Sequence, residues 1–184
     1  VASVEVGEYL GAEPVLVDSG SDTFNIDLNQ VEEILKKDAT QEIKAIIPVH
    51  FGGQSVNMKR VNQLAEKYDL FVLEDAAHAF ETVTNSRKVG NTNHAGAFSC
   101  YANKNITTGG GGGALATNDN NLADRVRKLS LHGMDKDGWK RFEIGEKWQY
   151  DVSELGYKYN MTDIAASFGL EQLTHINEWH KRRC

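Results

Sequence analysis

Three polar side chains stand near the ends of apolar runs in the sequence, and their types could do chemistry together. Asp75 closes the run L-F-V-L-E-D, Ser99 stands late in the run H-A-G-A-F-S-C-Y, and Lys104 follows Ser99 by five residues. A carboxylate that leaves a buried strand needs a positive partner or hydrogen-bond donors, because a desolvated charge otherwise protonates. Lys104 or a bound cation could meet that need. Alternatively, Asp75 caps a short helix that begins at A-A-H-A-F.

His78 follows Asp75 by three residues, which would place both side chains on the same side of one helical turn. Two interpretations are open for this histidine. It could bind a metal together with Glu74 and Asp75, or it could be a buried, hydrogen-bonded structural histidine. The metal interpretation lacks a second histidine four residues away, so we predict no metal site.

Lys104 precedes two threonines and five consecutive glycines. A solvated surface position is the commonest fate of a lysine. Small neighbours and glycines would instead let the backbone approach a ligand, and partial desolvation suits a lysine to nucleophilic use. The glycines do not form a nucleotidase phosphate loop, in which the lysine follows the glycines and opens a helix. A G-x-G-x-x-A match is trivial in a glycine run and leads into a strand, so a dinucleotide site is also rejected.

An acid at one strand end, a serine at another and a lysine just beyond suit pyridoxal phosphate. This cofactor needs a lysine for its Schiff base, a carboxylate facing the pyridine nitrogen and donors for its phosphate. Asp75, Lys104 and Ser99 are candidates for these three roles.

The elements that would position these residues alternate along the chain. Continuous apolar runs predict strands, and apolar residues at helical spacing after Asp or Asn predict helices. The predicted strands are 13–18, 43–50, 70–75, 94–101 and 113–118, and the predicted helices are 27–38, 57–69, 119–132 and 161–184. Buried strands separated by helices indicate a three-layer α/β/α fold with a mainly parallel, mixed sheet. Ligands of such sheets bind beyond the carboxyl ends of the strands, where the candidate residues stand.

Composition excludes some classes of function. The 184 residues carry a formal net charge of −6, which argues against a nucleic-acid surface. No membrane span or secretion signal is recognisable, so we expect a cytoplasmic protein. Cys100 and Cys184 are the only cysteines, and two such residues favour reduced thiols over a disulfide framework.

Ordered motifs across most of the chain resemble the DegT/DnrJ/EryC1/StrS sugar aminotransferases, which share the fold of aspartate aminotransferase. The matching motifs are V-L-E-D-A-A-H-A, F-S-C-Y-A-N-K-N-I-T-T-G, L-H-G and E-L-G-Y-K-Y-N-M-T-D-I-A-A-S-F-G-L-E-Q-L, with G-A-E-P-V-L-V-D and P-V-H-F-G-G-Q before them. The resemblance implies the large domain of a fold-type I pyridoxal phosphate enzyme. We expect residues 1–184 to be part of that domain, without its start and without the smaller C-terminal domain.

The resemblance also implies roles for individual residues. Lys104 would hold the cofactor covalently and then move a proton, and Asp75 would face the pyridine nitrogen. His78 would touch the ring hydroxyl and Ser99 would bind the phosphate. The family works as a homodimer, in which the stretch G-Y-K-Y-N-M reaches the neighbour's cofactor phosphate. Lys158 occupies the position of that contact, where many members have asparagine.

The implied reaction moves an amino group from an amino acid such as glutamate to a keto nucleotide-sugar. Trp139, Lys140, Arg141, Trp148 and Tyr150 could hold the base and diphosphate, or could pack across the dimer. Two other functions are open. A sugar dehydratase would carry histidine in place of Lys104, and a non-catalytic relative would only bind the sugar nucleotide.

One position departs from the family pattern next to the lysine. Gly110 stands where the family usually has glutamate, which adds roughly 1 kcal/mol of backbone entropy to the loop behind Lys104.

Overall fold

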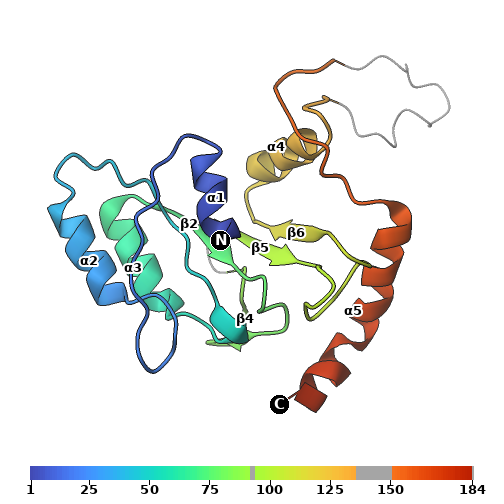
Figure 1. The fold of residues 1–184 in the computed structure, drawn as a ribbon, viewed down its shortest axis with the longest axis horizontal. Coiled ribbons are helices and arrows are strands. Elements are labelled where there is room, and N and C mark those ends of the chain that lie inside the picture. Colours follow the sequence, from blue (N-terminus) through green and yellow to red (C-terminus); the bar gives the residue numbers. More distant parts are fainter. Residues whose placement is uncertain (92–93, 136–150, 184) are drawn as a thin grey trace.

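The computed structural model describes residues 1–91, 94–135 and 151–183. In chain order, the elements are α1 (Ala2–Glu8), α2 (Leu28–Lys37), β1 (Ala45–Ile46), the 3-10 turn η1 (Phe51–Gly53), α3 (Met58–Tyr68), β2 (Phe71–Asp75), β3 (Val83–Thr84), β4 (Arg87–Lys88), β5 (Ala95–Ser99), β6 (Gly113–Ala116), α4 (Asn120–Ser130) and α5 (Asp163–Arg183). In Figure 1, α2 and α3 lie on one side of the central strands and α5 lies on the other.

The central sheet has the strand order β1-β2-β5-β6. Strand β2 pairs in parallel with β1 and with β5, whereas β6 pairs antiparallel with β5. The predicted α/β fold with a mainly parallel, mixed sheet is therefore confirmed. Because β2 and β5 run in the same direction, their carboxyl ends meet at one edge of the sheet.

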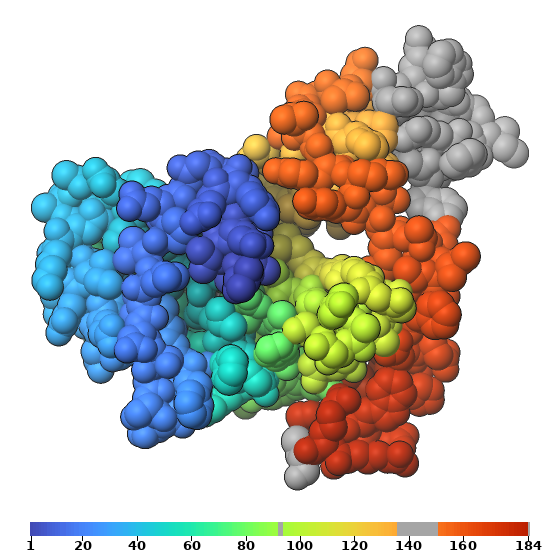
Figure 2. Space-filling view, viewed as in Figure 1, coloured from blue at the N-terminus to red at the C-terminus, as the bar shows by residue number. Residues whose placement is uncertain are grey.

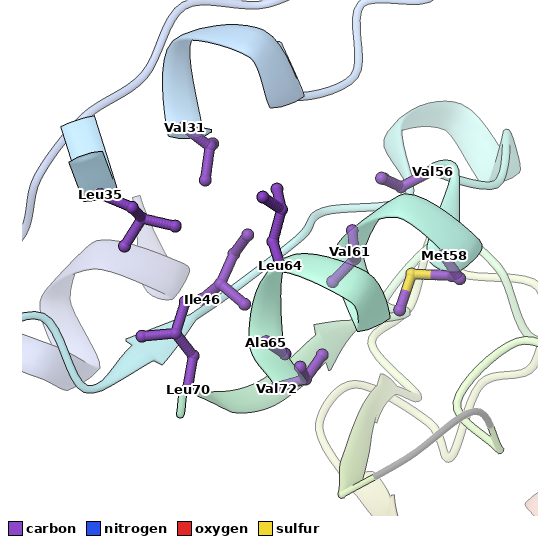
Figure 3. Close-up of a cluster of buried hydrophobic side chains, with 10 residues drawn as sticks. All are labelled: Val31, Leu35, Ile46, Val56, Met58, Val61, Leu64, Ala65, Leu70 and Val72. Carbon is purple, nitrogen blue, oxygen red and sulfur yellow. The ribbon is translucent and has the colours of Figure 1, made fainter. Parts of the chain in front are cut away.

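Helices α2 and α3 form as their sequences predict. The Asp27 carboxylate accepts a hydrogen bond from the backbone of Asn29, and the Asn57 side chain accepts one from Arg60, so each helix has an N-terminal cap. Their apolar faces pack with β1 and β2 into the main core shown in Figure 3. The buried core residues are Val31, Leu35, Ile46, Val56, Met58, Val61, Leu64, Ala65, Leu70 and Val72.

Two strand predictions need correction. Residues 13–18 form no strand, and Leu16 is 75% exposed. The predicted strand 43–50 is reduced to β1, because Pro48 has no N–H to continue the ladder. Pairing resumes beyond this proline, where the Asp75 N–H donates to the Pro48 carbonyl over 2.9 Å.

Helix α5 confirms the long helix predicted at 161–184, although little of it is buried. Of its residues, Gly169 and Ile176 are buried. The apolar residues whose helical spacing predicts this helix are exposed: Ile164, Phe168, Leu170 and Leu173. At the last turn, Arg183 forms an ion pair with the buried carboxylate of Glu81. Figure 2 shows α5, orange to red, beside the yellow-green segment that follows β5.

None of the helices within the described residues is both long enough and apolar enough to cross a membrane. Cys100 lies just after β5 and is buried as a free thiol, and this burial raises the pKa of its thiol above the ordinary value.

Candidate active site

Asp75 is the last residue of β2, and its carboxylate is held by two neutral donors. The Ser3 hydroxyl of α1 donates to Oδ2 over 2.6 Å, and the Ala77 N–H donates to Oδ1 over 3.1 Å. No ion pair joins Asp75 to Lys104 within the described residues. Residues 76–79 form a turn and no helix, so the predicted helix cap is in fact a hydrogen bond within a turn. The carboxylate therefore stays at the sheet edge without an ion pair to any of the residues that the structure describes.

Behind Asp75, a buried polar pair fixes the end of β2. Glu74 and His50 are 1% and 0% exposed, and Glu74 Oε2 lies 3.0 Å from His50 Nε2. The Val56 N–H donates to His50 Nδ1 over 3.1 Å, which leaves the ring proton on Nε2, where it is donated to Glu74. The Gly90 N–H also donates to Glu74 Oε2 over 3.0 Å. The backbone N–H of His50 donates to the Asp75 carbonyl over 3.0 Å. The segment that carries His50 is therefore hydrogen-bonded to the end of β2, where Asp75 lies.

Ser99 and Lys104 stand at the same sheet edge as Asp75. The parallel register places Asp75 opposite Ala97, and Ser99 ends β5 two residues further on. The Tyr101 N–H donates to Ser99 Oγ over 3.3 Å, and the Lys104 N–H donates to the Tyr101 carbonyl over 3.0 Å. A tight turn thus carries the chain from Ser99 to a half-buried Lys104.

His78 is exposed, so its interpretation as a buried structural histidine is wrong. Its ring centroid lies 6.4 Å from that of Phe51, with the rings at 67°. It follows Asp75 within the turn and does not lie on a helix. A shared metal site with Glu74 is disfavoured because Glu74 points into the interior, on the opposite face of β2 from Asp75. The described residues contain no cluster of three metal-binding side chains.

Lys158 is exposed and lies in a segment that pairs with the end of α4. It forms an isolated antiparallel bridge with Leu131, and its neighbours Tyr157 and Tyr159 stack with their ring centroids 4.9 Å apart. The candidate base-binding residues Trp139, Lys140, Arg141, Trp148 and Tyr150 lie outside the described residues.

The glycine run after Lys104 adopts backbone conformations that other residues avoid. Gly110 and Gly112 have φ angles of +145° and +135°, a region in which side chains cause strain. A Cβ on Gly112 would clash with Thr108 Oγ1. The run thus lets the chain fold back beside Thr108, whose hydroxyl contacts the carbonyls of Cys100 and Gly111.

Replacing Gly110 with glutamate, the residue that the resemblance leads us to expect here, should lower stability. Nothing lies within 4 Å of a Cβ at this position, so the cost is backbone strain of about 1–3 kcal/mol, which exceeds the entropy gained by removing a glycine. We expect a lower denaturation midpoint for Gly110→Glu. Gly20→Ala, at a glycine without positive φ, is the control. A midpoint raised by the glutamate would contradict this account.

Sequence reasoning missed three residues that support the site: Ser3, His50 and Gln172. His50 could have been found by the rule that selected Asp75, because it is a polar residue that ends an apolar run. Ser3 and Gln172 act across 72 and 65 residues of sequence, and local patterns do not reveal such contacts.

The donor set of this edge suits pyridoxal phosphate. A carboxylate that has no ion pair within the described part of the chain favours a group that brings a protonated ring nitrogen, and a hydroxyl and an amine stand at the end of the neighbouring strand and in the turn after it. The mixed sheet with these groups beyond its parallel strands is the large-domain fold of fold-type I pyridoxal phosphate enzymes.

The chain belongs to the DegT/DnrJ/EryC1/StrS aminotransferase family, whose profile matches residues 1–184. This family depends on pyridoxal phosphate. The chain is 46% identical over 175 residues to the spore coat polysaccharide biosynthesis protein SpsC of Bacillus subtilis, covering 95% of this chain and 44% of that protein. It is 39% identical over 183 residues to a UDP-4-amino-4-deoxy-L-arabinose–oxoglutarate aminotransferase of Shewanella sediminis, covering 100% of this chain and 46% of the relative.

Solved structures agree with these relatives. The PLP form of Spr1654 from Streptococcus pneumoniae superimposes with a TM-score of 0.81 at 32% identity, over 96% of this chain and 47% of that one. The chain thus spans less than half the length of the relatives that it matches.

Proposed function

We propose that the protein is an aminotransferase that moves an amino group from an amino acid, such as glutamate, to a keto nucleotide-sugar. The observation that carries this proposal is the common sheet edge of Asp75, Ser99 and Lys104. The activity for which the Shewanella relative is named supports a nucleotide-sugar and a 2-oxo acid as reaction partners.

Each site residue has a proposed role. The Lys104 amine binds the cofactor and then carries a proton to and from the reacting carbon. The Asp75 carboxylate keeps the pyridine nitrogen protonated, and the Ser99 hydroxyl donates to the phosphate. When bound, pyridoxal phosphate supplies an electron sink that stabilises negative charge on the amino-bearing carbon. The exposed position of His78 leaves its ring free to meet the cofactor hydroxyl.

We also propose that residues 1–184 are part of a cofactor-binding large domain that works as a homodimer. The exposed apolar side chains of α5, among them Ile164 and Phe168, support an interface at this helix. Lys158 would reach the partner's cofactor phosphate. The expected cytoplasmic location stays a prediction.

Trapping with borohydride tests the role of Lys104 in the intact protein. Added pyridoxal phosphate should give a visible absorption band, and reduction should leave a stable adduct on the peptide that contains Lys104. Lys104→Arg keeps the charge and should give no adduct there, while Lys128→Arg on α4 serves as the matched control. Absence of an adduct in the wild-type protein would favour a relative that only binds the sugar nucleotide.

A further inference from the structure

The residues that follow Lys104, which we call the lysine loop (residues 104–112), rest on helix α5. Ile106 is 2% exposed and packs with Ile176 of α5 and with Cys100 in a buried cluster. Two residues along the loop, the Thr108 methyl group would lie 3.0 Å from a Cβ placed on Gly169. Figure 2 shows this segment against α5. The helix thus presents its only two buried positions among the described residues, 169 and 176, to this loop.

Between these two contacts, Gln172 binds both backbone groups of Thr107. The Thr107 N–H donates to Gln172 Oε1 over 3.0 Å, and Gln172 Nε2 donates to the Thr107 carbonyl over 2.6 Å. The same Nε2 also donates to the Phe168 carbonyl over 2.8 Å, which fixes the orientation of the amide. Positions 169, 172 and 176 are spaced by three and four residues, so the contacts form one stripe along the helix.

The amide contact with Gln172 restrains a loop whose glycines allow it many backbone conformations. The loop includes four glycines, at positions 109–112, and each lowers the cost of alternative backbone conformations. A side-chain amide that pairs with one N–H and one C=O of the same residue acts like a short piece of strand pairing. It limits the movement of the loop three residues after Lys104.

We propose that Gln172 is a positioning residue for Lys104, acting through Thr107. This inference rests on the proposed role of Lys104 as the residue that binds the cofactor. Ile106 and Gly169 contribute packing contacts. Gln172 also restricts the orientation of the loop, because its amide oxygen and its amide nitrogen must both be placed to bond with Thr107 at the same time. Glutamate at this position keeps the size of the side chain but loses the donor and sets a carboxylate oxygen against the Thr107 carbonyl.

Three variants of the intact protein test the proposal: Gln172→Ala, Gln172→Glu and the control Asn177→Ala. Asn177 is an exposed amide on the same helix. The first readout is hydrogen exchange of the Thr107 amide without cofactor. The second is the rate at which the borohydride-trapped adduct forms on Lys104, measured well below each variant's denaturation midpoint.

Gln172→Ala should speed Thr107 exchange about tenfold and slow adduct formation about tenfold, as expected for two lost hydrogen bonds. Gln172→Glu loses the donor and keeps an acceptor for the Thr107 N–H, so it should change both rates in the same direction by a smaller factor. Asn177→Ala should match the wild type in both. Unchanged Thr107 exchange, or an unchanged adduct rate with only a lower midpoint, would overturn the proposal and leave Gln172 with a structural role. If the wild-type protein itself forms no adduct, the proposed role of Lys104 fails first, and the exchange data still report on the amide contact.

Discussion

Replacing Asp75 with asparagine should lower kcat about 10²- to 10³-fold, the usual effect of removing one preorganised electrostatic group from an active site. An asparagine cannot hold a proton on the pyridine nitrogen, so the ring becomes a weaker electron sink. The fold should survive this change. An asparagine oxygen can still accept from the Ala77 N–H, and its amide group can donate to the Ser3 hydroxyl.

The matched control for this prediction is Asp124→Asn on α4, where the carboxylate is 72% exposed and paired with Arg127. It should retain wild-type kcat. Measurement of transamination at saturating cofactor, beside the denaturation midpoint of each variant, separates chemistry from stability. If Asp75→Asn retained more than a tenth of the activity with cofactor bound, Asp75 would not be the group that faces the pyridine nitrogen.

The parts of the fold that the sequence predicts correctly are those in which several local signals agree. Helix α2 has an Asp27 cap and inward-facing Val31 and Leu35, and each of these features is present in the structure. Strand β2 is a continuous apolar run that leads to a polar end. Because the carboxyl ends of neighbouring parallel strands share an edge, the apolar runs that end near Asp75 and Ser99 are enough to predict that these two residues lie at one edge of the sheet.

The failures have physical reasons that a local pattern does not contain. The run around Leu16 has the composition of a buried strand, but no partner strand within the described chain pairs with it, and Leu16 stays exposed. His78 has the sequence position of a core residue because it follows a buried strand. The chain instead turns directly after Asp75, and this turn directs His78 outward.

Contacts between distant segments complete the site. Ser3 reaches Asp75 from α1, and Gln172 reaches Thr107 from α5. Neither residue type suggests a site by itself, since serine and glutamine are common on helix surfaces. Only the folded arrangement shows that one contacts the carboxylate and the other contacts the lysine loop.

Replacing His50 with leucine should cost about 3–5 kcal/mol of unfolding free energy, because the buried Glu74 carboxylate then loses its hydrogen bond from His50 Nε2. The Val56 N–H would also lose its acceptor. Denaturant unfolding of the intact protein measures the loss. Glu74→Gln should cost much less, since its amide oxygen can still accept from His50 and Gly90 without a buried charge.

A double variant distinguishes the effect of the buried charge from the effect of side-chain packing. If the buried carboxylate causes the loss, then the double variant His50→Leu/Glu74→Leu should be more stable than His50→Leu alone, because the second change removes a buried charge that has lost its hydrogen bond from His50. A double variant as unstable as the sum of the single changes would instead mean that packing dominates.

Since the backbone of His50 also binds the Asp75 carbonyl, loss of the pair should weaken the site as well as the fold. His50→Leu protein that still folds should therefore bind pyridoxal phosphate less tightly than Glu74→Gln, and equal binding would show that the end of β2 is held in place without the pair.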